Sequence, residues 1–212
     1  MILSHKYKFI FIKTRKTAGT SIECALADIC GDDDIITPIS AEDEQFRKRG
    51  PQNYKRNGAK VFYNHMTAAE VLAQVGPEVF YNYFKFTVER NPFEKVISLY
   101  WYLINAGFMG KIPLQDFVRG PRLAMVKDWD HYTIDDALAV DMAGRYEALD
   151  SCLWFVADRL GLDPLWLPRA KANFRHDRRP AAEVFSENEK NIIARYFANE
   201  IKFFGYGQGD DK

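Results

Sequence analysis

The segment Phe9–Leu26 places the tightest constraint on the fold of this chain. It starts with four apolar residues, Phe9–Ile12, which predict a short buried strand. A polar loop, Lys13–Ser21, follows, and apolar residues then recur at the i, i+3, i+4, i+7 spacing of a helix. Gly31 predicts the end of that helix. The sequence therefore predicts a strand, a loop and a helix in direct succession.

The loop of this unit has the composition of an anion site. A loop between a strand and a helix points backbone N–H groups and the positive end of the helix at a bound anion. Lys16 adds a cation, Thr17, Thr20 and Ser21 add hydroxyl donors, and Gly19 allows close backbone approach. We interpret the loop as a phosphate or sulfate site, and an ordinary turn with a solvated lysine is the alternative.

A second polar segment follows the alternating strand predicted at Tyr83–Glu89. Asn91 is a suitable N-cap and Pro92 suits the first position of the next helix. Arg90 precedes this helix, and Ser98 lies off its apolar stripe, on the side of Asn91. Arg90 and Ser98 can therefore face a ligand while the opposite side of the helix packs.

His65 lies between a short strand predicted at Val61–Tyr63 and a helix opened by the capping box of Thr67 and Glu70. We expect that helix to end near Gly76. Open α/β sheets bind ligands where a strand's carboxyl end meets a helix start, so His65 is a candidate site residue. A structural histidine is the alternative.

Composition limits the class of protein. The 212 residues suit one domain, residues 1–212, with a charged loop at about 32–60. The 29 basic and 29 acidic residues balance, which gives no electrostatic reason to expect nucleic acid or a membrane as partner. Three unpatterned cysteines fit a reducing compartment, and the apolar run at the N-terminus is too short for a signal or a membrane span. We expect a cytoplasmic protein, and the oligomeric state stays open.

The first loop resembles a known family. Its order K-T-A-G-T-S differs from the nucleotide-triphosphate loop, G-x-x-x-x-G-K-[ST], and resembles the 5′-phosphosulfate loop of sulfotransferases that use 3′-phosphoadenosine 5′-phosphosulfate (PAPS). The resemblance is closest to the glycan-directed branch related to heparan sulfate 2-O-sulfotransferases, with Arg15 where that branch usually has proline. It implies that the 5′ end of PAPS is held by Arg15, Lys16, Thr17, Ala18, Gly19, Thr20 and Ser21.

The second segment, R-N-P-F-E-K-V-I-S-L-Y, resembles the 3′-phosphate signature of the same superfamily. By this resemblance Arg90 and Ser98 would hold the 3′-phosphate, and an arginine suits the task because its planar fork pairs two phosphate oxygens. Lys95 stands where the family often has arginine, and Glu89 is an acidic neighbour of the phosphate ligand.

The resemblance also implies roles for residues elsewhere. His65 would be the base that deprotonates the acceptor hydroxyl, and Lys16 would be a catalytic cation. In the basic stretch Pro168–Pro180, either Arg169 and Lys171 or a second group would cover the nucleotide phosphates. That second group is Arg175, Arg178 and Arg179.

The implied fold is α/β: a central parallel β-sheet flanked by helices, in the P-loop-like sulfotransferase arrangement. Later parts of the chain predict a short helix starting at Thr133–Asp136, a strand within Val140–Tyr146 and a helix ending at Gly161. A capping box at Ser186 predicts a last helix. Arg145 and Glu147 either line the cleft or form a structural pair, and three aromatic residues either stack on a sugar or belong to the core: Phe108, Trp129 and Tyr132.

The implied activity is in-line transfer of a sulfuryl group from PAPS to a hydroxyl of an unidentified acceptor, with a glycan as one candidate. The product would be 3′-phosphoadenosine 5′-phosphate (PAP), and no metal is required. Two other functions stay open, a P-loop small-molecule kinase and a catalytically silent nucleotide-binding protein. The loop order disfavours the kinase.

Overall fold

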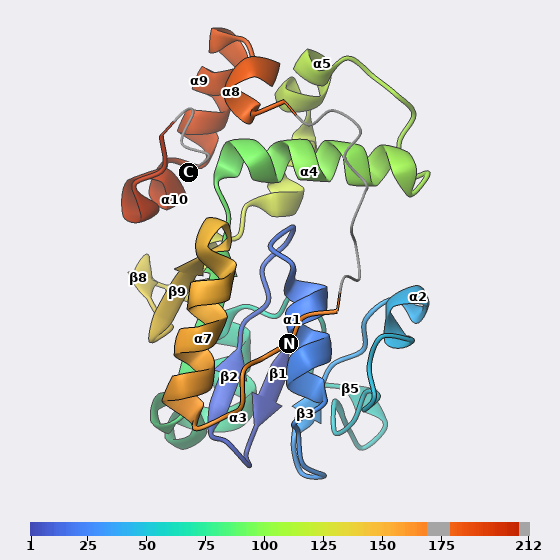
Figure 1. The fold of residues 1–212 in the computed structure, drawn as a ribbon, viewed down its shortest axis with the longest axis vertical. Coiled ribbons are helices and arrows are strands. Elements are labelled where there is room, and N and C mark those ends of the chain that lie inside the picture. Colours follow the sequence, from blue (N-terminus) through green and yellow to red (C-terminus); the bar gives the residue numbers. More distant parts are fainter. Residues whose placement is uncertain (169–178, 208–212) are drawn as a thin grey trace.

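A five-stranded sheet forms the centre of one half of the molecule, in the order β3-β1-β2-β6-β9 (Figure 1). The computed structural model describes residues 1–168 and 179–207. The strands are β1 (Ile2–Ser4), β2 (Phe9–Phe11), β3 (Ile35–Ile36), β6 (Phe84–Glu89) and β9 (Met142–Arg145). β2, β6 and β9 are parallel, which confirms the predicted α/β class. β1 adds an antiparallel strand because a tight turn joins it to β2.

Helices cover both faces of the sheet and form a second layer beyond its edge (Figure 1). The helices against the sheet are α1 (Gly19–Ala27), α3 (Ala68–Asn82), α6 (Trp129–Tyr132) and α7 (Leu149–Leu160). The second layer contains α4 (Pro92–Asn105), α5 (Leu114–Arg119), a 3₁₀ turn (Pro121–Val126), α8 (Ala181–Val184), α9 (Glu187–Tyr196) and α10 (Ala198–Phe204). The remaining short elements are α2 (Ala41–Glu44), a 3₁₀ turn (Tyr146–Ala148), and the hairpins β4 (Lys55–Arg56)–β5 (Ala59–Lys60) and β7 (Thr133–Ile134)–β8 (Ala137–Leu138).

Alternation along the strands explains how both faces of the sheet are buried. Side chains of a strand point to opposite faces in turn. On β2, Phe9 and Phe11 pack with α1 and α7, whereas Ile10 packs with α3 and α6 on the other face. A third apolar cluster joins α4 to α5, α8 and α9. Thus α4 belongs to the helical layer, although it starts directly after a strand of the sheet.

The parallel pairing of β2 and β6 brings together the two segments that the sequence singles out. Phe9 pairs with Phe84 and Phe11 with Phe86. Just beyond the strand, the Ile12 N–H donates to the Phe86 carbonyl at 2.9 Å. Parallel neighbours end at the same edge of a sheet. The loop after β2 and the segment after β6 therefore emerge side by side, facing the helical layer.

Several predicted elements agree with the structure. The capping boxes that begin at Thr67 and Ser186 are both present, and the Asn91 side chain accepts from the Phe93 N–H at 3.0 Å. α7 ends at Gly161, whose φ of 63° is left-handed. The three cysteines, Cys24, Cys30 and Cys152, are buried and form no disulfide.

Four sequence predictions about elements were wrong. The charged loop at 32–60 contains β3, α2 and a hairpin, and residues 61–63 form no strand. β3 is only two residues long, too short to give a periodic signal. α3 continues past Gly76, where φ of 79° makes a kink and Pro77 restarts the helix. Thr133–Asp136 belongs to the β7–β8 hairpin, because Asp135 and Asp136 adopt positive φ in its turn.

No described helix is both long enough and apolar enough to cross a membrane. No group of three or more His, Cys, Asp or Glu in residues 1–168 and 179–207 is arranged to hold a metal ion.

Candidate active site

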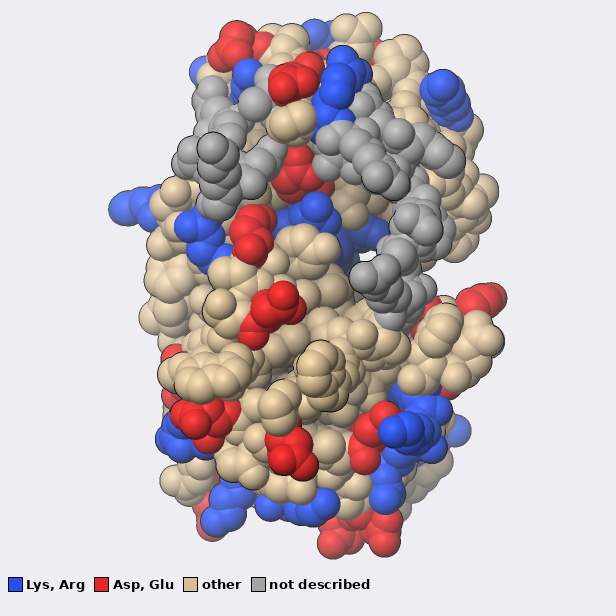
Figure 2. Space-filling model, viewed as in Figure 1, with Lys and Arg blue, Asp and Glu red and all other residues tan. Residues whose placement is uncertain are grey.

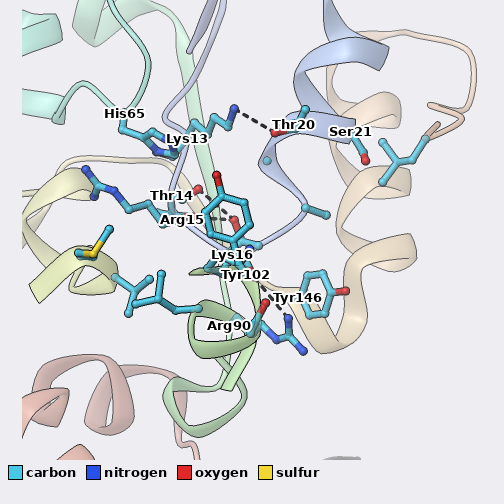
Figure 3. A pocket seen from close by; sticks show the side chains of 18 of the residues that line it. Lys13, Thr14, Arg15, Lys16, Thr20, Ser21, His65, Arg90, Tyr102 and Tyr146 are labelled. Atoms are coloured by element: carbon cyan, nitrogen blue, oxygen red, sulfur yellow. Dashed lines mark hydrogen bonds between the residues drawn. The ribbon is translucent and has the colours of Figure 1, made fainter. Parts of the chain in front are cut away.

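A cavity of about 570 Å³ opens where the two polar segments leave the sheet (Figure 3). Its size lies within the usual range for small-molecule sites. It is lined by Lys13, Thr14, Arg15, Lys16, Thr17, Ala18, Gly19, Thr20, Ser21, His65, Arg90, Ser98, Leu99, Tyr102, Met125, Val126, Tyr146, Leu167 and Pro168. All charged groups in this described lining are cations, and no aspartate or glutamate is among them.

The backbone of the first loop is arranged to receive an anion. Lys16 and Ala18 have φ of 63° and 59°, a left-handed conformation that is uncommon outside glycine. Such strain is concentrated at functional sites, and left-handed residues in a loop turn successive N–H groups toward one concave side. α1 starts at Gly19 without a side-chain cap, so its first N–H groups are available to an anion.

The two cations expected to hold phosphates both lie against tyrosine rings. Lys16 Nζ is 4.1 Å from the centre of the Tyr102 ring, and the Arg90 guanidinium carbon is 4.4 Å from the centre of the Tyr146 ring. Arg90 Nη1 also donates to the Lys16 carbonyl at 3.5 Å, so the two segments touch (Figure 3). Arg90 Nη2 lies 3.4 Å from a carboxylate oxygen of Glu94.

Arg90 retains an unused donor. Its Nε is buried, and the described residues offer it no hydrogen-bond partner. A buried donor without a partner costs free energy. A phosphate oxygen would satisfy it, so the residues present fit an anionic ligand at this position.

His65 lies on the wall of the cavity, beside Lys13 and Arg15 (Figure 3). Its Nδ1 is 3.1 Å from the Lys13 carbonyl oxygen. Because a carbonyl only accepts, Nδ1 carries the proton and Nε2 is left with a free lone pair. Burial, followed by the charges of Lys13 and Arg15, lowers the pKa of His65 to about 3. The imidazole is therefore neutral at physiological pH.

The Lys13 side chain passes close over Gly19 and makes a buried ion pair. Its Nζ lies 2.5 Å from a carboxylate oxygen of Glu23 and 3.4 Å from the Thr20 hydroxyl. Burial alone would raise the pKa of Glu23, but the Lys13 charge and other neighbouring positive groups outweigh it and lower this pKa to about 2. A Cβ atom on Gly19 would meet the Lys13 Cγ at 2.7 Å. Gly19 is thus required for the passage of the Lys13 side chain.

Comparison with known proteins bears on the class of this site. The model of the Sulfotransferase family matches residues 1–121 of the 212, more than half of the chain. The chain belongs to the Sulfotransferase family. The crystal structure of a sulfotransferase from Alicyclobacillus acidocaldarius is similar with a TM-score of 0.47 and 13% identity, over 94% of this chain and 96% of that one. A comparison with curated proteins found no match.

Family membership supports sulfuryl transfer as the activity of this enzyme. The matched region contains the first loop, His65, Arg90 and Ser98, and the structure brings all of them to the same cavity. The part of the cavity that lies outside the match comes from Met125 and Val126 of the first 3₁₀ turn, from Tyr146 and from the segment 167–168.

Some predicted site residues are not in the cavity or lie outside the described part of the chain. Arg169 and Lys171, with Arg175 and Arg178 of the alternative group, fall in the residues that the structure does not describe. Arg179 is described, but it is exposed and does not line the cavity.

The structure bears on the five residues that had two open interpretations. Trp129 and Tyr132 belong to the buried core, whereas Phe108 is exposed and lies outside the cavity lining. Glu147 accepts from the Asn91 N–H at 2.8 Å. The Arg145 guanidinium lies over the Tyr206 ring, so both residues have structural partners.

Sequence reasoning missed several lining residues. Tyr102 lies one turn beyond Ser98 on α4, so the i, i+4 spacing could have identified it. Tyr146 lies between the two residues that drew attention, Arg145 and Glu147. Met125 carries no local signal of its own, since only the tertiary fold places the 3₁₀ turn at the cavity.

Proposed function

We propose that this sulfotransferase transfers the sulfuryl group of PAPS to a hydroxyl group of an acceptor, by in-line displacement. One observation carries the proposal: Lys16 with its loop, and Arg90 with Ser98, line a single cavity, and the charged groups in its described lining are all cationic. PAPS has anionic groups at both ends of one adenosine, the 5′-phosphosulfate and the 3′-phosphate. Two cationic segments that leave adjacent parallel strands suit these two ends.

The first segment would hold the 5′ end of the donor. The residues concerned are Arg15, Lys16, Thr17, Ala18, Gly19, Thr20 and Ser21. When bound, PAPS supplies a sulfuryl group whose S–O bond to the 5′-phosphate breaks as a bond to the acceptor oxygen forms. Lys16 and the N–H groups at the start of α1 would stabilise the charge that develops on the phosphate oxygen.

The second segment would hold the 3′ end. Arg90 presents a planar guanidinium with a buried Nε donor, and Ser98 adds a hydroxyl from the next turns of α4. Arg169 and Lys171 would add contacts to the nucleotide from the basic stretch that follows.

His65 would take the proton of the acceptor hydroxyl at Nε2. Its neutral state leaves that lone pair free, but a pKa of about 3 makes the free imidazole a weak base. Negative charge nearby favours the protonated imidazole. The phosphates of the donor would therefore raise the pKa of His65 as they bind. A pKa closer to the working pH would make the imidazole a better proton acceptor.

The acceptor would be a carbohydrate or another small hydroxyl compound. This part of the proposal rests on the resemblance of the first loop to the glycan-directed branch. A screen of carbohydrate and non-carbohydrate hydroxyl compounds with ³⁵S-labelled PAPS tests it. Transfer of label to a sugar hydroxyl is expected. Transfer only to other hydroxyl compounds would exclude the carbohydrate acceptor, and transfer to no hydroxyl compound would contradict the proposal as a whole.

A P-loop kinase is the main rival. It would need a carboxylate to hold magnesium near the phosphates, and the described lining of the cavity offers none. A thermal-shift series with PAP, PAPS, ATP with magnesium, and GTP separates the two. We expect stabilisation by PAP and PAPS. Stabilisation by ATP with magnesium, and none by PAP, would overturn the proposed donor.

A silent nucleotide-binding protein is the second rival, and His65 distinguishes it. In the His65→Ala variant we expect kcat to fall by about 100-fold or more, while the dissociation constant of PAP changes little. The exposed His5 provides a matched control, because His5→Ala removes a histidine outside the cavity. Unchanged turnover in His65→Ala would remove His65 from the mechanism, and no turnover of any acceptor by the wild type would favour the silent protein.

A further inference from the structure

A line of buried charged groups joins the backbone of Arg15 to the backbone of Arg90. We propose that Asp128 and Lys95, two members of this line, are positioning residues that hold the two anion-binding segments at the separation one bisphosphorylated nucleotide requires. The inference rests on the proposed function, because it concerns how the same site grips both ends of its donor.

The line consists of four short contacts. Asp128 Oδ2 accepts from the Arg15 N–H at 2.6 Å and lies 2.9 Å from Lys95 Nζ. Lys95 Nζ then lies 2.6 Å from Glu89 Oε1. The same Glu89 oxygen accepts from the Arg90 N–H at 2.7 Å. One end is thus fixed to the first loop, and the other to the residue that begins the second segment.

Asp128 also fixes the Arg15 side chain. Its Oδ1 is 2.7 Å from Arg15 Nη1, and that nitrogen lies 2.9 Å from His131 Nε2. Since the guanidinium can only donate, His131 Nε2 accepts. Burial lowers the pKa of His131, in keeping with a neutral ring at this position. The backbone and the guanidinium of Arg15 are therefore both held by one carboxylate.

Stability alone does not explain such a network. The exposed fractions of Glu89, Lys95 and Asp128 are 0%, 1% and 0%. The free-energy cost of desolvating buried charges is about as large as the gain from their mutual attraction. Apolar residues at these positions would therefore often give the same stability. Hydrogen-bonded charges do impose fixed distances, which apolar packing does not.

The network can act on a ligand only through other residues. Neither Asp128, nor Lys95, nor Glu89 is in the lining of the cavity, whereas Arg15 and Arg90 are. Arg15 and Lys95, where the sequence departs from the family it resembles, meet Glu89, the acidic neighbour of Arg90, in this one network. Their charges are therefore parts of one arrangement that spans both segments.

The test compares ligands that use one segment with a ligand that uses both. Isothermal titration measures PAP, adenosine 5′-monophosphate and adenosine 3′-monophosphate, the latter two up to millimolar concentration. In Asp128→Asn we expect the dissociation constant of PAP to rise about tenfold or more. Adenosine 3′-monophosphate should change by less than about threefold, because it needs only the segment of Arg90. Adenosine 5′-monophosphate should weaken less than PAP does, although Asp128 also holds Arg15.

Asp141→Asn is the matched control. Asp141 also accepts from a backbone N–H, at 2.7 Å, and lies 2.8 Å from a lysine, but both contacts are to Lys85, and neither residue lines the cavity. Its PAP affinity should equal that of the wild type. Asp128→Glu, which keeps the charge, should recover part of the lost PAP affinity.

If Asp128→Asn does not fold, the charge-balanced double variant Lys95→Met/Asp128→Asn replaces it in the same titrations. A PAP dissociation constant within about threefold of the wild-type value, or equal weakening of all three nucleotides, would overturn the positioning role while leaving the proposed function intact. Failure of the wild-type protein to bind PAP would overturn the proposed function, and this inference with it.

Discussion

At the scale of single residues, His65 makes a measurable prediction about protonation. Its pKa of about 3 lies far below the value of about 6.5 for an unperturbed histidine. In NMR spectra of the ligand-free protein, the His65 ring signals should therefore not titrate between about pH 5 and 8. His65→Asn identifies these signals by their loss. Addition of PAP should move the titration upward, and a midpoint near 6.5 without ligand would contradict the structure.

The same pKa has a consequence for stability. Between about pH 6.5 and 3 the unfolded chain binds a proton at His65 that the folded protein does not. Protonation of His65 in the unfolded chain therefore lowers the free energy of unfolding progressively as the pH falls through that range. At higher pH both states are neutral, and His65 does not affect the pH dependence of stability. In His65→Asn this loss of stability is removed, so the melting temperature should fall less steeply with decreasing pH than in the wild type.

Gly19 makes a second prediction at this scale. In Gly19→Ala, the new Cβ would collide with Lys13, so we expect a loss of about 1–3 kcal/mol of unfolding free energy and weaker PAP binding. Gly50 is the control, because a Cβ there meets nothing within 4 Å. Gly50→Ala should change stability by less than about 0.5 kcal/mol. Equal effects of the two substitutions on chemical denaturation would show that Lys13 does not pass over Gly19 as described.

At the scale of elements, the cap of α4 links helix stability to the second segment. Asn91→Ala removes the cap between Arg90 and the helix and should cost about 1 kcal/mol. Ser186→Ala removes the cap of α9, which has no part in the cavity lining, at a similar cost. Only Asn91→Ala should also raise the dissociation constant of PAP. If both variants bind PAP equally, the start of α4 does not position Arg90.

Elements with local signals could be predicted from the sequence. The strand–loop–helix at Phe9–Leu26, the caps of three helices and the stop at Gly161 were all predicted, because each depends on residues close together in the chain. Elements decided by distant partners could not. β3 exists because Ile35 and Ile36 pair with β1, and nothing near them in the sequence shows this.

At the scale of the whole molecule, the cavity lies where the sheet meets the helical layer. Figure 2 shows basic side chains together in the hollow between these two parts, whereas the face below the hollow is tan with scattered acidic side chains. The balanced total of 29 basic and 29 acidic residues therefore conceals a local excess of cations. Many residues of the cavity lining could be predicted because two loops carry local motifs. The Arg15–Asp128 contact could not, since it spans 113 positions of the sequence.

Three of the sequence predictions stay predictions at this scale: the cytoplasmic location, the single-domain organisation over 1–212, and the contribution of Arg169 and Lys171. The central claim is that two cationic segments grip opposite ends of one bisphosphorylated adenosine. A crystal structure of the protein with PAP tests this claim most directly. We predict the 5′-phosphate within hydrogen-bond distance of Lys16 and the N–H groups at the start of α1, and the 3′-phosphate on Arg90 and Ser98. A nucleotide bound elsewhere, or one phosphate left in solvent, would contradict it.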